Sequence, residues 1–295
     1  MFAQFFGNYL IKKNLITKAQ FDEIITHQKT IRVKLGLIAV SEKLLSPGKA
    51  DEINRLQATM DKRFGDIALE KGYLTSEQIN HLLSLQGNPY LLFAQTIVEK
   101  GYMTFEEFEE NLIAYQKELN LTDSELIALK SGDLDSIVPI FVKIQEPFYM
   151  EHIGLAIRNL NRFISSELYI DSAYSVTDYS FLHIAGQQLD GQHSIFLGFA
   201  SNDDGILSIA NPYAKENFNT VDEDAYDAVC EFINCINGLF ASKLSHEDVE
   251  IDMLPPVFYH NKKLQSSSSF YVIPIYIEGV RVDLIASVDT VLKFQ

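Results

Sequence analysis

Three polar residues on one predicted helix have the types and spacing needed to position a water molecule. Asp227, Glu231 and Asn234 are separated by four and three residues. On an α-helix with 3.6 residues per turn these positions, together with Gly238, fall within about 60° of one another. A carboxamide can accept from and donate to a water, but it is too weak a base to take its proton. The stripe therefore favours a site that orients water over one that supplies a nucleophile.

The same stretch carries the apolar pattern of a helix that covers a core. Periodicity predicts a helix over 222–245, with the apolar side opposite the stripe. The residues on that apolar side are Val229, Phe232, Ile233, Ile236, Leu239, Phe240 and Leu244. The stripe is thus expected to face solvent. A Glu and an Asn on such a face are often only solvated, and that alternative stays open at this point.

The segments around this helix predict an α+β domain over 148–295. Helical periodicity covers 148–165. β-like runs are predicted at 167–173, 179–185, 193–200 and 205–210, with turns at 186–191 and 202–205. After the long helix, strands are predicted at 249–254, 270–278 and 280–288, with a polar loop at 266–269. Gly279 separates the last two strands, which indicates a hairpin.

This C-terminal pattern resembles the CheC/CheX family of chemotaxis phosphatases, in particular the single-site CheX type. The family signature is an Asp or Ser, a Glu four positions on, an Asn three further and a Pro some twenty residues later. Here the signature reads Asp227, Glu231 and Asn234, followed by Pro255 or Pro256. CheC-type proteins carry two such helices, and a single one is found in this sequence, so CheX is the closer relative.

The resemblance spans about 148–290 and implies hydrolysis of the phospho-aspartate of a response-regulator receiver domain. Glu231 and Asn234 would be the catalytic residues: Asn234 would position the water, and Glu231 would pair with a receiver lysine. Asp227 and Gly238 would contact the partner. The resemblance implies no cofactor of the protein's own, because the receiver carries the required Mg²⁺. CheX-type proteins pair, so a homodimer is expected.

A period of 29 residues organises the N-terminal part of the chain. The pairs that recur at this period are Phe6-Gly7, Leu35-Gly36, Phe64-Gly65 and Phe93-Ala94. Seven residues after each small residue comes a position suited to a left-handed helix end: Asn14, Lys43, Gly72 and Gly101. Capping boxes that open a second helix are predicted at Thr17, Thr75 and Thr104. Each unit is thus a short helix, a tight turn and a longer helix, and four units predict an all-α repeat domain over 1–117.

These units resemble the MshEN domain, found at the N-terminus of type II secretion and pilus assembly ATPases, in which tandem motifs form a c-di-GMP site. By this resemblance the candidate ligand residues are Arg63 and Gln86, then Lys34 and Gln57. The arginine position holds Phe or Leu in two units, and neither can replace a guanidinium that pairs with guanine or phosphate. A helical scaffold or docking domain is therefore favoured over a c-di-GMP site, which stays an alternative.

Composition narrows the class of protein. The formal charge is −16, from 24 Lys and Arg against 40 Asp and Glu, which opposes binding of nucleic acid. Cys230 and Cys235 point about 140° apart on the long helix, so a mutual disulfide is not expected, and a reducing cytoplasm is the expected location. The His residues lack metal-type spacing, and no metal site is predicted. No apolar run approaches the length of about 18 residues that spans a membrane, and no signal peptide is recognised.

Residues 118–147 are acidic and irregular, and they predict a linker with short helices of its own, one of them capped at Thr122.

Three functions stay open for the whole chain. The first is a CheX-like enzyme with a regulatory or docking helical domain. The second is a non-catalytic signalling adaptor that binds a partner protein or c-di-GMP, and the third is a dimerisation protein that uses its sheet edge. The intact pair of Glu231 and Asn234 favours the first.

Overall fold

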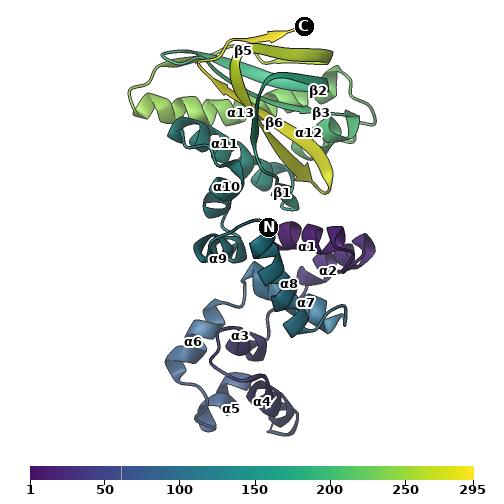
Figure 1. The fold of residues 1–295 in the computed structure, drawn as a ribbon, viewed down its shortest axis with the longest axis vertical. Coiled ribbons are helices and arrows are strands. Elements are labelled where there is room, and N and C mark those ends of the chain that lie inside the picture. Colours follow the sequence, from purple (N-terminus) through teal and green to yellow (C-terminus); the bar gives the residue numbers. More distant parts are fainter. Residues whose placement is uncertain (61) are drawn as a thin grey trace. The chain divides into compact units, whose positions relative to one another are not determined.

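The chain divides into two compact units in the computed structural model, which describes residues 1–60 and 62–295 (Figure 1). The N-terminal unit is Met1–Asp133 and the C-terminal unit is Leu134–Gln295. The first is built from helices, and the second combines helices with a β-sheet. The predicted combination of a helical N-terminal part and an α+β C-terminal part is confirmed. The division between the units falls within 118–147, the segment predicted to be a linker.

In the N-terminal unit, helices are joined by short turns. They are α1 (Phe2–Lys12), α2 (Lys18–Gln28), α3 (Leu35–Ser41), α4 (Pro47–Met60), α5 (Phe64–Glu70), α6 (Ser76–Ser84), α7 (Pro89–Glu99), α8 (Phe105–Glu118) and α9 (Asp123–Ser131). The four predicted left-handed positions all have positive φ: +57° at Asn14 and Lys43, +66° at Gly72 and +70° at Gly101. The capping boxes predicted at Thr17, Thr75 and Thr104 are formed. These local predictions are confirmed.

Aromatic rings fill the core of the N-terminal unit. Phe6, Phe93 and Phe108 are fully buried, and their ring centroids lie 5.3 to 6.3 Å apart. They come from α1, α7 and α8, so the first and last helix pairs of the predicted repeat share one cluster. Truncating one such ring to Ala costs about 3–5 kcal/mol of folding free energy in typical cores.

The C-terminal unit holds a sheet with helices packed against it. Its elements are α10 (Leu134–Val142), α11 (Pro147–Asn159), a π-helical turn (Leu160–Ile164), β1 (Leu168–Ile170), β2 (Tyr174–Gly191), β3 (Ile195–Ser201), α12 (Asp203–Ala214), α13 (Glu223–His246), β4 (Ile251–Met253), β5 (Val257–Ile277), β6 (Val280–Val288) and β7 (Leu292–Phe294). The strands run antiparallel to their neighbours in the order β1-β5-β6-β3-β2-β4, and β7 pairs with β5. Because β2 also pairs with β5, the path β5-β6-β3-β2 closes on itself.

Three predicted segments of this unit were wrong: 205–210, 186–191 and 266–269. The run at 205–210, predicted to be a strand, lies in α12, because Asn202 caps a helix by accepting from the Gly205 N–H at 3.0 Å. A short apolar run cannot by itself distinguish a strand from a buried helix. The stretch 186–191, predicted to be a turn, continues β2. Gly186 is needed there for space, since a Cβ would lie 2.3 Å from the Phe196 ring.

Other predicted elements agree with the structure. The hairpin between β5 and β6 turns at Gly279, whose φ is +89°. The predicted strands at 167–173, 193–200 and 249–254 contain or overlap β1, β3 and β4. The third wrong segment is the polar loop predicted at 266–269, which lies within β5. No helix in the described ranges is long and apolar enough to cross a membrane.

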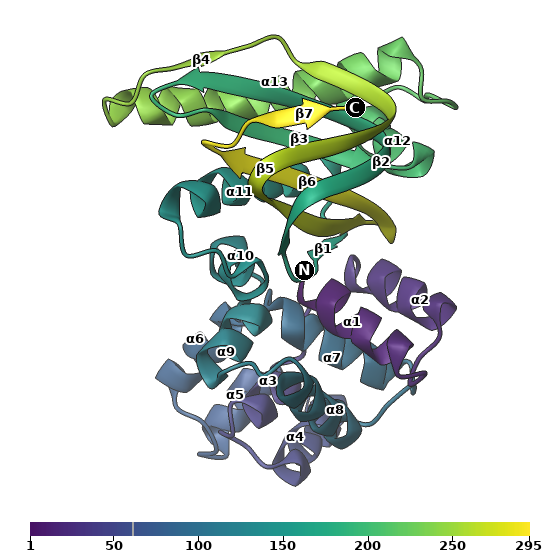
Figure 2. The same cartoon turned by 45° about the horizontal axis from the view of Figure 1, so that its top comes forward.

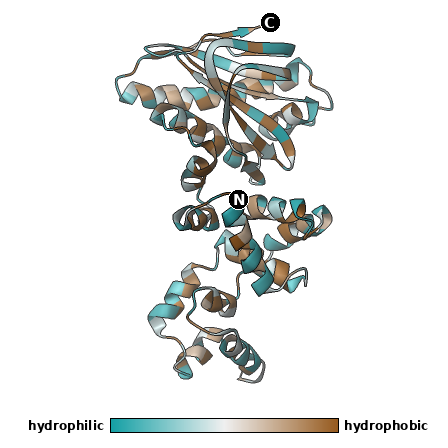
Figure 3. Cartoon of the chain, viewed as in Figure 1, coloured by the Kyte–Doolittle hydropathy of each residue, from teal (hydrophilic) through white to brown (hydrophobic). Residues whose placement is uncertain are grey.

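Helix α13 lies along the sheet, with α11 and α12 beside it (Figures 1 and 2). Its apolar side packs on β2 and β3, where Phe232 stacks on Phe199 at 5.8 Å between ring centroids. Hydrophobic and hydrophilic residues both occur along this helix in Figure 3. Leu239, predicted to face the core, is 49% exposed, whereas Asn237 is fully buried. The buried arc is thus rotated toward Asn237, and Leu239 falls at its edge.

Candidate active site on helix α13

Helix α13 is a stable support for the stripe, because its first turn is capped and the charges at its ends suit the helix dipole. The side chain of Asp222 caps the first turn by accepting from the Ala225 N–H at 3.0 Å. Acidic residues occupy the first turn, and Lys243 lies in the last turn, each where the helix dipole favours its charge. A site built on such a helix is held more rigidly than one on a loop.

The structure brings the predicted stripe together on one face of α13. Asp227, Glu231 and Asn234 are exposed, as the helical period predicts, and Gly238 is half-buried. Within the described part of the chain, the carboxylates of Asp227 and Glu231 form no hydrogen bond or ion pair. Both charges are therefore free to meet a cation on another molecule.

The amide of Asn234 is oriented by a residue that the sequence analysis missed. Gln187 on β2 donates from Nε2 to Asn234 Oδ1 at 2.9 Å and to the backbone carbonyl of Leu254 at 2.8 Å. Gln187 is only 1% exposed. The sequence analysis missed Gln187 because it predicted a turn, and not a strand, at 186–191. Strand alternation would have found it, since His183 and Gln187, four residues apart, both contact α13.

A buried polar pair stands behind Gln187. Asn237 donates from Nδ2 to Gln187 Oε1 at 2.9 Å, and its Oδ1 lies 2.8 Å from Nε2 of His152. The His152 ring stacks on Phe240, with centroids 4.1 Å apart and planes 7° apart. Burial lowers the pKa of His152 to about 4, because the charged imidazolium would be desolvated. The ring is therefore neutral at pH 7.

Gly238 is not required by its own surroundings. A Cβ built there would contact only the Met253 sulfur, at 3.9 Å, which is an ordinary van der Waals distance. Glycine in a helix interior costs about 1 kcal/mol relative to alanine. The fold thus carries an unfavourable residue at this point of the stripe without an internal steric reason.

Exposed apolar side chains flank the acidic stripe. They are Leu239, Met253, Leu254 and Phe258, which are 49%, 36%, 39% and 40% exposed. Leu239 follows Gly238, and Met253 lies beside it. Leu254 supplies the carbonyl that Gln187 holds, and Phe258 stacks on Tyr226, at 4.3 Å between centroids. A group of exposed apolar side chains beside polar residues is a feature of protein-docking surfaces.

A second polar cluster lies near the start of α13. His183 is 3% exposed, and its ring nitrogens hydrogen-bond to the Tyr226 hydroxyl and the Asp203 carboxylate. These residues and His260 line a cavity of about 500 Å³. Both nitrogens of His183 are occupied, so the ring behaves as a satisfied core histidine. Over residues 1–60 and 62–295, no group of three or more His, Cys, Asp or Glu side chains is arranged to hold a metal.

The candidate ligand residues of the N-terminal unit have varied surroundings. Arg63 is exposed at the start of α5. Lys34 pairs with Glu99 at 2.6 Å. Gln86 donates to the backbone carbonyl of Val33 at 3.0 Å, and Gln57 donates to that of Lys62 at 3.4 Å. The amides of Gln86 and Gln57 thus hold the backbone.

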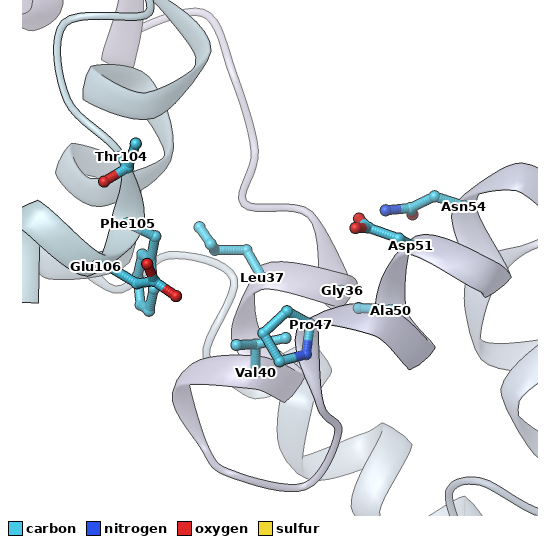
Figure 4. Close-up of a pocket in the computed structure, with 10 residues that line it drawn as sticks. All are labelled: Gly36, Leu37, Val40, Pro47, Ala50, Asp51, Asn54, Thr104, Phe105 and Glu106. Atoms are coloured by element: carbon cyan, nitrogen blue, oxygen red, sulfur yellow. The ribbon is translucent and has the colours of Figure 1, made fainter.

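A largely apolar groove of about 350 Å³ lies elsewhere in the N-terminal unit, between α3, α4 and the start of α8. In Figure 4, Leu37 and Pro47 lie between Phe105 on one side and Asp51 on the other. None of the four candidate ligand residues lines this groove. Its apolar walls and acidic edge suit a peptide segment better than a dinucleotide with two phosphates.

Residues 184–276 match the family model described as chemotaxis phosphatase CheX. Among similar solved structures is a CheC-like superfamily protein from Shewanella sp. PV-4, with 18% identity, 49% of this chain and 99% of that chain covered, and a TM-score of 0.43. Chemotaxis protein CheX from Vibrio vulnificus has 17% identity, coverages of 48% and 99%, and a TM-score of 0.43. A CheX–CheY–BeF₃–Mg²⁺ complex from Borrelia burgdorferi has 18% identity, coverages of 48% and 97%, and a TM-score of 0.36.

A search of curated proteins finds no match. The matched segment contains Gln187, the whole of α13 and the loop that carries Leu254. The resemblance to MshEN domains concerns the N-terminal unit, which lies outside this segment. Residues 184–276 of the C-terminal unit thus form a CheX-like domain.

Proposed function

We propose that the C-terminal unit hydrolyses the phospho-aspartate of a response-regulator receiver domain, with Glu231 and Asn234 as its catalytic residues. One observation carries the proposal: within the CheX-like segment, an exposed carboxamide is held by a buried donor one turn from an unpaired carboxylate. The exposed stripe is also convex, since it lies on the outer face of a helix. Such a site fits a substrate that brings its own cleft, as a protein does, better than a small molecule.

The residues of the stripe suit the needs of phosphoryl transfer, which depends on positioning and charge stabilisation more than on covalent help. The receiver carries its own Mg²⁺ and lysine, and an in-line water is missing. One lone pair of Asn234 Oδ1 is used by Gln187, which leaves the second for a water O–H, while Nδ2 donates to the water or a phosphoryl oxygen. The water oxygen then bonds to phosphorus as the bond to the aspartyl oxygen breaks. The water proton leaves with the inorganic phosphate, and the aspartate is released as a carboxylate.

The other stripe residues serve the complex. The free carboxylate of Glu231 pairs with the receiver's lysine and sets the register of α13. Asp227 extends this polar contact by one further turn. Gly238 lowers the helix surface so that a partner backbone can approach closely. The apolar side chains around the stripe supply contact area.

The N-terminal helical unit serves as a regulatory or docking domain in this proposal. Its groove beside α3 is a surface that a partner segment could occupy. The protein acts in the cytoplasm, where receiver domains are phosphorylated, and it forms a homodimer as CheX-type proteins do. c-di-GMP is not the favoured ligand, because Gln57 and Gln86 are used by the fold and Lys34 is paired.

The test is loss of phosphate from phosphorylated receivers of the same genome, measured with the wild type and with Asn234→Ala. We expect wild-type protein to accelerate the loss and the variant to abolish the acceleration. We expect the free energy of unfolding to fall by about 1–3 kcal/mol, because the buried Gln187 amide loses the acceptor of one part-buried hydrogen bond, and alanine's higher helix propensity offsets part of that loss. Cys235→Ser is the matched control, since Cys235 is exposed on the same helix outside the stripe and should keep full activity. An Asn234→Ala variant as active as wild type would refute this mechanism.

A further inference from the structure

A continuous chain of hydrogen bonds runs from the interior of the C-terminal unit to the surface amide of Asn234. His152 on α11 contacts Asn237 on α13 at 2.8 Å, and Asn237 contacts Gln187 on β2 at 2.9 Å. Gln187 contacts Asn234 at 2.9 Å. The first three residues are 2%, 0% and 1% exposed, so water cannot easily replace one of these bonds. Three elements that lie apart in the sequence therefore meet behind the proposed catalytic amide.

A single backbone carbonyl determines the direction of every bond in this chain. The Leu254 carbonyl can only accept, so the Gln187 atom 2.8 Å from it must be the NH₂ nitrogen. Gln187 Oε1 then faces Asn237 and must accept, so Asn237 presents Nδ2 to it. The Asn237 oxygen in turn faces His152, so the His152 Nε2 must carry the hydrogen.

The same logic sets the orientation of Asn234. The second hydrogen of the Gln187 NH₂ group points at Asn234, which must therefore present its oxygen inward. Its NH₂ group is consequently turned away from Gln187, toward the space that a partner would occupy. Reversing any amide in the chain would place two carbonyl oxygens, or two NH₂ groups, against each other in a buried site.

We propose that Gln187, supported by Asn237 and His152, is a positioning residue that holds the Asn234 amide with its NH₂ group aimed at the phosphoryl group of the substrate. This inference rests on the proposed phosphatase function. The outward NH₂ group meets oxygens on which negative charge is concentrated. A donor fixed in advance needs no reorganisation when the reaction occurs, which is how electrostatic catalysis gains its effect. Linked hydrogen bonds also polarise one another, so the Gln187 bond makes the Asn234 NH₂ a stronger donor.

The direction of the chain can be tested without any activity measurement. ¹⁵N NMR of the His152 ring in the full-length wild-type protein reports which nitrogen carries the hydrogen. We expect a single neutral tautomer, protonated at Nε2, between pH 6 and 8. The side-chain NH₂ groups of Gln187 and Asn237 should exchange with solvent slowly, and that of Asn234 rapidly. A tautomer protonated at Nδ1 would reverse the chain and overturn the proposal.

The effect on the reaction is tested with Gln187→Met, which removes both donated bonds while keeping a side chain of similar length. We expect the single-turnover rate at saturating protein to fall about tenfold, the size of one hydrogen bond lost. The protein concentration that gives half of the maximal rate should stay within about twofold of the wild-type value, because Gln187 is buried and does not touch the receiver. The matched control is Gln188→Met, which changes the next residue of β2, whose amide bonds to Ser194 and Asp190 instead. It should keep the wild-type rate.

These results separate the proposed phosphatase function from the positioning role of Gln187. An unchanged single-turnover rate in Gln187→Met would overturn the positioning role. So would a fall in the rate that comes with an equally large rise in the protein concentration needed for half of the maximal rate. If wild-type protein shows no activity on any receiver, the proposed function fails, and the positioning role, which rests on it, fails with it. If wild-type protein is active but the His152 tautomer is protonated at Nδ1, the positioning role fails alone.

Discussion

Replacing Gly238 with alanine separates a role in the fold from a role in partner binding, because the two effects have opposite signs. The new Cβ would touch only the Met253 sulfur at 3.9 Å, so no strain is introduced in the free protein. Alanine is better than glycine in a helix interior by about 1 kcal/mol, partly because it restricts the unfolded chain. We therefore expect the free energy of unfolding to rise by up to about 1 kcal/mol.

In the complex the same methyl group would occupy space that the proposed interface fills with the partner's backbone. Adding atoms to a packed contact costs about 1–3 kcal/mol, which corresponds to a Kd about 5-fold to 150-fold weaker. The assay is titration of the wild type and Gly238→Ala against a fluorescently labelled receiver carrying beryllofluoride and Mg²⁺, alongside urea unfolding of each protein.

Gly48→Ala is the control for this experiment. Gly48 lies in α4 of the N-terminal unit, and a Cβ there would meet no atom within 4 Å. It should be neutral or stabilising, with no effect on receiver affinity. The reasoning about the interface is refuted if Gly238→Ala binds the receiver as tightly as wild type. A loss of stability in that variant would instead show that the space around Gly238 is smaller than the structure indicates.

Three further predictions follow from the geometry. Glu231→Gln should weaken receiver binding by about 1–2 kcal/mol and make the binding less dependent on salt, because the substitution removes a charge that is unpaired in the free protein. Titrations of the receiver at low and high salt check this, and an unaltered salt dependence would count against the ion pair. Burial lowers the pKa of His152 to about 4 in the folded protein, below the ordinary histidine value of about 6.5 in the unfolded chain, so stability that is present above pH 6.5 is lost as the pH falls toward 4. Between pH 7 and pH 5 the free energy of unfolding should fall by about 2 kcal/mol, and urea unfolding of His152→Gln should lack that part of the pH dependence. Calorimetric titration of the full chain with c-di-GMP should give no heat, since Gln86 holds the Val33 carbonyl and Lys34 pairs with Glu99, and saturable heat would restore the MshEN interpretation.

Local features of this protein could be predicted from the sequence because they depend on residues close together in the chain. The spacing of Asp227, Glu231 and Asn234 places them on one helix face whatever the rest of the fold does. The capping boxes and left-handed helix ends of the N-terminal unit likewise involve backbone groups within one turn. The hairpin at Gly279 belongs to the same class, since its φ of +89° favours glycine.

Features that depend on packing between distant elements were decided only by the tertiary structure. Two glycines made the stretch around Gln187 look like a turn, although Gly186 instead makes room for Phe196 within β2. Asn237 lies one position beyond the apolar arc of α13, and nothing in the helical period says that it is buried while Leu239 is exposed. That follows from where β2 and α11 meet the helix, because a buried amide is tolerated only where partners such as Gln187 and His152 complete its hydrogen bonds. The sequence alone thus determined which residues share the stripe, and the packing of three distant elements decided how the Asn234 amide is held.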